Sequence, residues 1–196
     1  MEKVRRAVET DRKEIVDCIL DAFDKLFSDF IKSVGRNKVQ KFLEETLQVD
    51  RFFLIENEQE IIGTLAISDI KGRAIYGSEK VAQRVFGPMI GWILYRVHFK
   101  EFEIDHCGSK NMGYIEFVAI KQKFQGRGLA SVLMKRVISE TDHEGYLLDV
   151  VDTNIPAIRC YSRLGFREIK REKVRFSKQK GFKQKIFMEY RKGETR

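Results

Sequence analysis

The segment that most constrains the fold is an apolar run followed at once by a glycine-containing turn and an amphipathic helix. Residues 113–120 (GYIEFVAI) are almost entirely apolar and indicate a buried β-strand. The turn spans residues 121–131 (KQKFQGRGLAS), and residues 126–140 carry apolar side chains at helical spacing. The sequence therefore predicts a strand, a tight turn and a helix in direct succession.

Gly126 and Gly128 in this turn indicate an anion site. Glycine lets the backbone turn tightly, so several amide N–H groups can point at one anion while the helix start adds partial positive charge. We therefore predict a pyrophosphate cradle. A P-loop would need a Gly-Lys-Ser/Thr ending, and a dinucleotide fold would need GxGxxG in an early strand–helix unit; neither is present. The plain alternative is that the two glycines only begin a helix.

Strands and helices are predicted along the rest of the chain as well. Strands are expected at residues 3–8, 51–56, 60–68, 113–120, 145–151, 166–171 and 182–190, with a polar turn at residues 57–59. Helices are expected at residues 10–26 with Thr10 as the cap and Leu26 on the apolar face, and at 37–47, 126–140 and 154–164. Ser78 can cap a further helix to about residue 98, although two glycines and a proline interrupt its middle.

Composition fits one domain over residues 1–196. The chain is 43% hydrophobic and 34% charged with two prolines, so it can bury a core and is not of a disordered or low-complexity class. The most apolar run, residues 85–95, is well short of the ~20 residues that span a bilayer. No apolar stretch follows the basic start of the chain, so we expect a cytoplasmic location.

Cysteine spacing and net charge exclude some sites and leave others open. Three widely separated cysteines fit neither a disulfide framework nor a zinc site, and we predict no metal site. The net charge of +8 favours anionic partners such as nucleic acid, an acidic membrane surface or a phosphorylated cofactor. Charge alone does not choose among them.

The turn resembles the acetyl-CoA signature of the GNAT superfamily of N-acetyltransferases: Gln or Arg, two residues, Gly, one residue, then Gly or Ala. By this resemblance the CoA pyrophosphate is held by Gln125, Gly126, Arg127, Gly128, Leu129, Ala130 and Ser131. The preceding strand looks like the family's fourth strand, whose backbone near Val118 and Ile120 pairs with the pantetheine arm. Lys121, Lys123 and Arg127 could meet the CoA phosphates, although solvated surface charge is the commoner explanation.

Residues 154–166 (NIPAIRCYSRLGF) resemble the family's second conserved block. Asn154 and Tyr161 are seven residues apart and therefore share one helix face. The resemblance implies that Asn154 bonds the pantetheine and that Tyr161 reaches the sulfur. The plain alternative is an amphipathic helix ended by Gly165, with Tyr161 as a core tyrosine.

The resemblance implies an α/β fold of mixed α+β type over most of the chain. We expect a central, mostly antiparallel mixed sheet of about seven strands, with splayed fourth and fifth strands and about four or five flanking helices. It also implies acetyl-CoA as co-substrate and direct transfer of the acetyl group to a primary amine. A non-catalytic acetyl-CoA-binding sensor or interaction module on the same fold is the alternative.

Two side chains are candidates for proton transfer. By the resemblance, Tyr161 is the general acid that protonates the departing CoA thiolate. Glu116 is a candidate general base because it is the one acidic residue in an otherwise apolar strand, and strand alternation predicts it on the same face as Tyr114, Val118 and Ile120. The alternative is a carboxylate paired with a nearby Lys or Arg.

The acceptor amine is not identified by the sequence. Residues 70–112 form a variable segment that could be a substrate wall, a dimer contact or additional core. Small-molecule and peptide amines remain open as acceptors, and a homodimer is a candidate assembly. Nucleic acid is not predicted as a partner, because the basic run at residues 170–185 alternates with apolar residues, as in edge strands with lysines facing water. A membrane is not predicted either, because no apolar run is long enough to span one.

Overall fold

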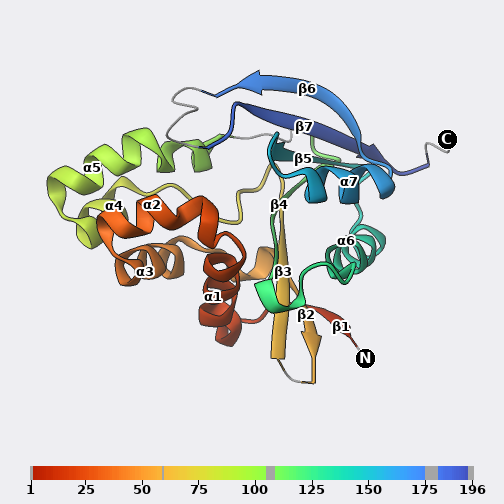
Figure 1. Ribbon diagram of the computed structural model, residues 1–196, viewed down its shortest axis with the longest axis horizontal. Helices are drawn as coiled ribbons and strands as arrows, with labels where there is room; N and C mark the ends of the chain where they lie inside the picture. Colours follow the sequence, from red (N-terminus) through yellow and green to blue (C-terminus); the bar gives the residue numbers. More distant parts are fainter. Residues whose placement is uncertain (1, 59, 105–108, 175–180, 194–196) are drawn as a thin grey trace.

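A mixed β-sheet organises the protein in the computed structural model (Figure 1), which describes residues 2–58, 60–104, 109–174 and 181–193. Among these residues the sheet has seven strands in the order β1-β2-β3-β4-β5-β7-β6. The strands are β1 Lys3–Arg6, β2 Phe52–Asn57, β3 Glu60–Ser68, β4 Met112–Ile120, β5 Gly145–Val151, β6 Arg167–Lys173 and β7 Gln184–Arg191. All neighbours are antiparallel except β4 and β5, which confirms the mostly antiparallel mixed sheet predicted from the sequence.

The β4 and β5 strands diverge after a short paired stretch. Residues 112–114 of β4 pair in parallel with residues 145–147 of β5, and the pairing ends at Tyr114 and Leu147. β5 continues alongside β7 through Val151, whereas β4 continues alongside β3 through Ile120. The expected splay of the fourth and fifth strands is therefore confirmed.

Helices cover both faces of the sheet. They are α1 Arg12–Ala22, α2 Asp24–Val34, α3 Arg36–Thr46, α4 Glu79–Phe86, α5 Pro88–Val97, α6 Leu129–Glu140 and α7 Ile155–Arg163. The first five lie on one side, here called the α1 side, and α6 and α7 lie on the other, here called the α6 side (Figure 1). The described residues thus form seven helices where four or five were expected.

The first predicted helix is wrong in its start and its length. Thr10 lies in a short 3-10 turn, Glu9–Asp11, and α1 begins after it without a side-chain cap. The chain leaves helical geometry at Phe23 (φ −104°, ψ 19°), so a second helix, α2, follows α1 directly. Leu26 falls in α2, and its side chain lies outside the described residues.

The predicted helix at residues 78–98 divides into two. Ser78 does cap α4, since its hydroxyl accepts a hydrogen bond of 3.3 Å from the N–H of Val81. Gly87 then adopts a φ of 95°, a conformation that other residues rarely take, and Pro88 begins α5 with its fixed φ. The other predicted elements are confirmed to within three residues at each end.

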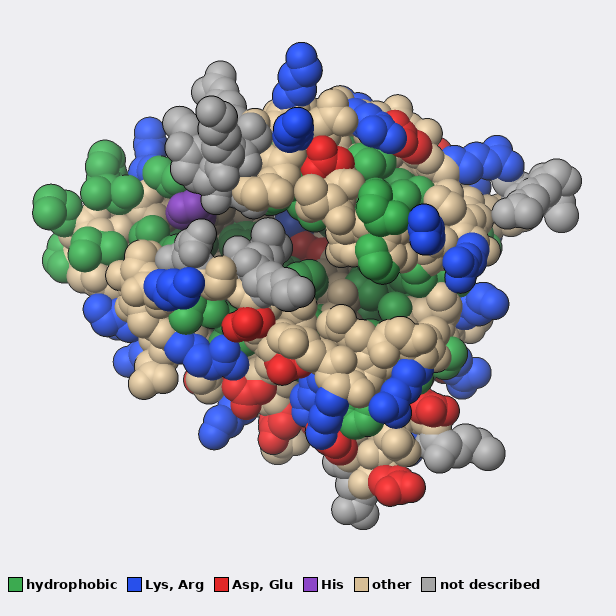
Figure 2. Space-filling model, viewed as in Figure 1, with side chains coloured by type: hydrophobic (Ala, Val, Ile, Leu, Met, Phe, Trp, Pro, Cys, Tyr) green, Lys and Arg blue, Asp and Glu red, His purple; other side chains and the backbone are tan. Residues whose placement is uncertain are grey.

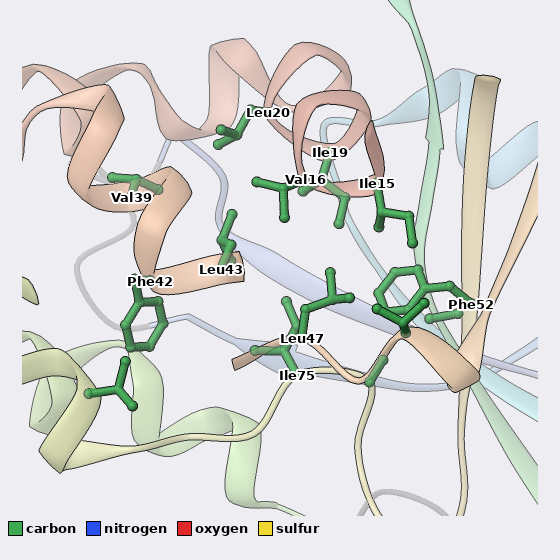
Figure 3. Close-up of a cluster of buried hydrophobic side chains, with 14 of the residues drawn as sticks. Ile15, Val16, Ile19, Leu20, Val39, Phe42, Leu43, Leu47, Phe52 and Ile75 are labelled. Atoms are coloured by element: carbon green, nitrogen blue, oxygen red, sulfur yellow. The ribbon is translucent and has the colours of Figure 1, made fainter. Parts of the chain in front are cut away.

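Two buried clusters fill the space between the sheet and the helices. On the α1 side, side chains of α1 and α3 meet β2 and the segment after β3. Figure 3 shows ten of them in contact range: Ile15, Val16, Ile19, Leu20, Val39, Phe42, Leu43, Leu47, Phe52 and Ile75. On the α6 side, α6 and α7 cover β4, β5 and β7. Each fully buried aliphatic or aromatic side chain contributes roughly 1.5–3 kcal/mol to folding, so these clusters fix the sheet that carries the site.

Candidate functional site

A β-bulge in β4 sets the geometry of the site. Phe117 has a φ of 53°, unusual for a residue other than glycine. The register with β3 shifts at this point, since Glu116 pairs with Ala66 whereas Ala119 pairs with Thr64. Two residues of β4 therefore oppose one residue of β3, and the extra residue bends the strand.

The bulge changes which face Glu116 occupies. Strict alternation predicted Glu116 on the face of Val118 and Ile120. Instead, Val118 and Ile120 pack with Ile115 in the cluster on the α6 side, whereas Phe117 packs on the α1 side. Glu116, next to Ile115, therefore points to the α1 side. The prediction is wrong because one inserted residue reverses the alternation.

Among the described residues, the edge of β4 beyond Tyr114 has no strand partner on its β5 side. The described pairing with β5 ends at Tyr114, while the other edge of β4 stays paired with β3 as far as Ile120. Backbone groups near Val118 and Ile120 are therefore open to an extended ligand that adds to the sheet as a strand would. This stretch leads directly into the glycine turn.

Both glycines of the turn adopt conformations that favour glycine. Gly126 has a φ of 77° and Gly128 a φ of 76°. A Cβ at either position would meet no atom within 4 Å, so the space next to the turn is open. Gly128 precedes α6 without a side-chain cap, and in the described part of the chain the amide N–H groups of residues 126–130 have no hydrogen-bond partner. The arrangement can accept an anion.

The side chains of the turn support the backbone. Gln125 donates a hydrogen bond of 2.9 Å to the carbonyl of Ile120, which ties the turn to the end of β4. Arg127 lies over the Phe124 ring at 5.3 Å and donates to the Lys123 carbonyl. Leu129 is buried in the cluster on the α6 side, and Ala130 packs against it.

The two lysines at the start of the turn pair with a carboxylate on β3. Lys121 and Lys123 both contact the Glu60 carboxylate, at 3.2 and 2.8 Å. These hydrogen bonds, from Lys123 and then Lys121, lower the pKa of Glu60. The lysines therefore already have a carboxylate partner at the base of the turn.

The start of α6 lies beside the second half of α7. The Oγ of Ser131 and the Sγ of Cys160 are 3.1 Å apart, which links the two helices. Asn154 caps α7, because its Oδ1 accepts a hydrogen bond of 3.2 Å from the N–H of Ala157. Its amide nitrogen remains exposed and can donate to a ligand.

Tyr161 is a buried phenol on α7. Its ring packs against Phe166, with centroids 6.2 Å apart, in the cluster on the α6 side. Burial, followed by the nearby Cys160 and Asp149, raises the pKa of Tyr161 above its ordinary value. Among the described residues its hydroxyl has no hydrogen-bond partner. It is therefore a protonated donor within electrostatic reach of Asp149.

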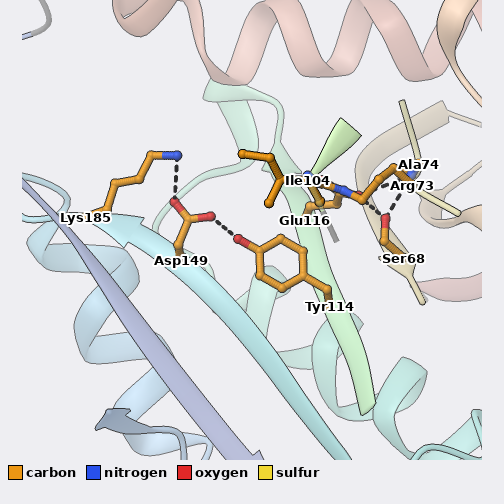
Figure 4. Close-up of polar contacts among 8 residues, drawn as sticks. All are labelled: Ser68, Arg73, Ala74, Ile104, Tyr114, Glu116, Asp149 and Lys185. Atoms are coloured by element: carbon orange, nitrogen blue, oxygen red, sulfur yellow. Dashed lines mark hydrogen bonds and ion pairs between the residues drawn. The ribbon is translucent and has the colours of Figure 1, made fainter. Parts of the chain in front are cut away.

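Asp149 lies on β5 just beyond the point where β4 and β5 separate. It accepts a hydrogen bond from the Tyr114 hydroxyl across the gap, and its other oxygen lies 3.5 Å from the Nζ of Lys185 (Figure 4). Burial and the Asp149 carboxylate raise the pKa of Tyr114. Sequence reasoning missed Asp149, although it is the one charged residue of GYLLDVV, the same signal that singled out Glu116.

Glu116 forms a network with the segment after β3 (Figure 4). Its carboxylate accepts hydrogen bonds from the Arg73 guanidinium at 3.2 and 2.7 Å, from the Ser68 hydroxyl and from the N–H of Ala74. Arg73 also donates to the carbonyl of Ile104 and lies 5.3 Å from the Tyr114 ring centroid. These contacts match the paired carboxylate that the sequence left as the alternative to a base.

The divergence of β4 and β5 opens into a hollow on the surface. Figure 2 shows this hollow near the centre of the face, with an acidic side chain on its floor. The β4 edge and Asp149 border this divergence, and the glycine turn follows the β4 edge. Asp149 lies between Leu148 and Val150, which pack on the α6 side, so it faces the α1 side as Glu116 does, whereas Tyr161 packs on the α6 side. No cluster of three metal-ligating side chains occurs in the parts of the chain that the structure describes.

A second opening lies away from these residues. It is a cavity of about 440 Å³ between the C-terminal ends of α6 and α7, and Lys135, Arg163, Tyr190 and Lys192 are among its lining residues. None of the predicted site residues lines it. Within the described ranges, no helix has the length and apolar character needed to cross a membrane.

Comparison with known families gives one match over most of the chain. Residues 19–166 match the family model described as the acetyltransferase (GNAT) family. The matched range includes the β4 edge, the glycine turn, Asp149 and Tyr161.

Individual relatives are distant in sequence. An N-alpha-acetyltransferase of Saccharolobus solfataricus is 23% identical over 140 residues, which cover 69% of this chain and 80% of the relative. An N-acetyltransferase structure from Staphylococcus aureus superposes with a TM-score of 0.65 at 16% identity, covering 96% and 100% of the two chains. A Salmonella typhimurium structure described as an acetyltransferase with its cofactor acetyl-CoA gives 0.56 at 15% identity, covering 99% and 95%. These two structures are similar to this chain in their fold.

Proposed function

The chain belongs to the acetyltransferase (GNAT) family, and we propose that it transfers an acetyl group from acetyl-CoA directly to the α-amine of a peptide or protein N-terminus. The observation that carries this proposal is the continuity of the unpaired β4 edge with the glycine turn. Together they offer a strand partner for pantetheine and a set of amide donors for pyrophosphate.

The cofactor would lie across this continuous surface. Gly126, Arg127 and Gly128, with the start of α6, would bind the pyrophosphate through backbone N–H groups, and the Ser131 hydroxyl lies at the same helix start. Val118 and Ile120 would pair with the pantetheine, and the amide of Asn154 would donate to it from the start of α7. The thioester would then lie in the divergence of β4 and β5, near Asp149.

Tyr161 would act as the general acid. The thiolate that leaves in the transfer needs a proton, and a phenol with a raised pKa stays protonated at neutral pH. Tyr161 follows Cys160, which contacts Ser131 at the start of α6, so its hydroxyl would be near enough to donate to the sulfur.

Asp149 is a better-placed candidate base than Glu116. It lies in the divergence where the thioester would end, and its polar contacts leave it partly exposed. Glu116 accepts hydrogen bonds from three residues, one of them the guanidinium of Arg73, so a base role for it stays a prediction with less support. Asp149 would take the amine proton directly or through one water.

The free-energy cost of deprotonating the acceptor amine favours one class of acceptor. Exposing the lone pair of a lysine-type amine, with a pKa near 10.4, costs about 4–5 kcal/mol at pH 7, whereas an α-amine near 7.8 costs about 1 kcal/mol. A single carboxylate that is hydrogen-bonded to a tyrosine is suited to deprotonating an α-amine, because that deprotonation costs less free energy. The name of the Saccharolobus relative, an N-alpha-acetyltransferase, agrees with an α-amine acceptor. A cytoplasmic location and a homodimer stay predictions.

The test measures CoA release from acetyl-CoA with a panel of peptides that differ in their N-terminal residue. Polyamines, lysine side-chain amines and aminoglycosides are tested separately as alternative acceptors. We expect α-amine peptides to give turnover, and Tyr161→Phe to lower kcat about 10²-fold with little change in the KM for acetyl-CoA. Turnover only with side-chain amines would contradict the α-amine proposal. Calorimetric binding of acetyl-CoA without release for any amine would favour the sensor alternative instead.

A further inference from the structure

Helix α5 exposes large apolar side chains to solvent. Five of its ten residues form what is called here the α5 apolar face, with exposed fractions of 75% for Met89, 49% for Ile90, 49% for Trp92, 45% for Ile93 and 59% for Val97. Figure 2 shows green side chains gathered at the left end of the molecule, where Figure 1 places α5. An apolar cluster of this kind marks a contact surface in a folded protein.

The packing of α5 on α4 explains why these side chains face outward. Gly91 is the one fully buried residue of α5, and a Cβ there would lie 2.3 Å from the carbonyl oxygen of Ala82. The two helices therefore approach most closely at Gly91. Leu94 and Tyr95 are the other side chains of α5 that pack inward. The opposite arc of the helix has no neighbour among the described residues and is apolar except for Arg96.

The charge on the α5 apolar face itself is basic. α5 contains no acidic residue, Arg96 lies among its exposed apolar side chains, and Lys80 and Lys100 are exposed on the flanking segments. Three described acidic side chains lie on neighbouring segments. Glu79 and Glu103 accept hydrogen bonds from the neutral side chains of Gln83 and Tyr95, and Glu45 pairs with Arg84.

We propose that the α5 apolar face docks on the surface of a membrane that contains anionic lipid. The helix, about 15 Å long, would lie in the plane of the interface with Trp92 and Ile93 at the headgroup–acyl boundary. Arg96, Lys80 and Lys100 would meet lipid phosphates. The sequence argued against a membrane partner because no segment is long enough to span, but a helix that lies on the surface does not need that length.

A second copy of the chain fits this surface less well. Specific dimers bury about 800 Å² on each partner, more than the outward arc of one ten-residue helix provides. Pairing two copies through α5 would also bring the two copies of Arg96 together. An anionic surface matches both the exposed apolar side chains of α5 and Arg96.

Trp92 makes the proposal directly measurable, because it is the one tryptophan of the chain. Its emission is recorded while the protein is titrated with vesicles of phosphatidylcholine alone or of phosphatidylcholine mixed with phosphatidylglycerol. We expect a blue shift and co-sedimentation only with the anionic vesicles, weakened by added salt.

Variants separate apolar insertion from charge. Ile93→Ser is expected to weaken vesicle binding about tenfold, and Arg96→Gln several-fold with a smaller salt dependence. Ile169→Ser, which removes an equally exposed isoleucine from β6, is the matched control and should bind as the native chain does. Thermal unfolding verifies that each variant is folded. No blue shift with either vesicle, equal binding by Ile93→Ser, or a concentration-dependent dimer that shields Trp92 without lipid would overturn the proposal.

Discussion

Asp149 and Glu116 are similar residues in different surroundings. Each is the one acidic residue of an apolar strand, so the sequence offers no basis for separating them. In the structure Asp149 lies in the divergence of β4 and β5, whereas Glu116 is tied to Arg73, Ser68 and Ala74. Position relative to the divergence therefore distinguishes a candidate base from a supporting carboxylate.

Asp149→Asn tests the base. We expect kcat/KM for an α-amine peptide to fall about 10²-fold at pH 7, with a smaller deficit at high pH, where the amine is already deprotonated. Initial rates between about pH 6 and about pH 9.5 measure the effect, because this range brackets the pKa of an α-amine. Glu116→Gln is the matched variant and should retain the native pH profile. If Glu116→Gln loses the profile and Asp149→Asn keeps it, the roles are reversed.

The Glu116–Arg73 pair is expected to matter for stability. Both side chains are nearly buried, with exposed fractions of 9% and 11%, so removing the carboxylate leaves a guanidinium without its main partner. Glu116→Ala should lower the free energy of unfolding by about 3 kcal/mol, measured by urea denaturation. The exposed pair of Arg171 and Glu168 is the control, since Glu168→Ala should leave the midpoint unchanged. Equal effects at the two sites would contradict this assignment.

At the scale of elements, the glycine turn and the bulge of β4 act together. The bulge at Phe117 reverses the alternation of side chains along β4. Val118 and Ile120 therefore pack on the α6 side, and their backbone leads into the turn. Gly126 and Gly128 then reverse the chain into α6 without crowding the opening. A regular strand would have placed Glu116 on the same face as Val118 and Ile120.

Gly128→Ala tests the turn as a ligand site. An alanine at a φ of 76° is strained by about 1 kcal/mol, and its Cβ would occupy the open space where the pyrophosphate is proposed to lie. We expect calorimetry to show acetyl-CoA affinity reduced at least about tenfold, beyond the loss in stability.

Gly181→Ala is the matched control for the turn, because Gly181 has a φ of 73° and equally open surroundings but lies in the connection between β6 and β7. It should lose similar stability while binding acetyl-CoA normally. Equal affinities for the two variants would remove the turn from the cofactor site.

At the scale of the whole molecule, one ion pair links β1 to the 3-10 turn that precedes α1. The Asp11 carboxylate accepts hydrogen bonds of 2.6 and 2.9 Å from Arg5 and one of 2.8 Å from the N–H of Val8. The hydrogen bond from Arg5 is the main cause that lowers the pKa of Asp11, against the opposing effect of burial. The folded state therefore prefers the carboxylate.

The sign of this shift predicts an acid-dependent loss of stability. A lowered folded-state pKa contributes stability that is fully present above the unfolded value, about 3.9, and is lost as pH falls through the folded value. Asp11→Asn should therefore be less stable than the native chain at pH 6, with the difference shrinking below about pH 4. Urea midpoints across this range measure it. A difference that is constant with pH would mean that Asp11 does not contribute through its charge.

Much of the fold could be predicted from the sequence because it depends on local patterns. Seven strands and the helices at residues 37–47, 126–140 and 154–164 were predicted correctly, since apolar periodicity and glycine positions act within a few residues of each other. The break at Gly87 was visible as a glycine–proline pair, and only its outcome as two helices was not. The break at Phe23 has no such signal in the sequence.

The sequence by itself determined the order of elements and the glycine turn, because backbone freedom at Gly126 and Gly128 is a property of those residues. Only the tertiary structure decided the partners of the polar side chains. Arg73 and Glu116 are 43 residues apart and Tyr114 and Asp149 are 35 apart, so their contacts depend on how β3, β4 and β5 align. The face on which Glu116 lies depends on the single inserted residue of the β4 bulge. The exposure of α5 depends on the close approach of two helices at Gly91. In both cases the decisive neighbours are not specified by the local sequence.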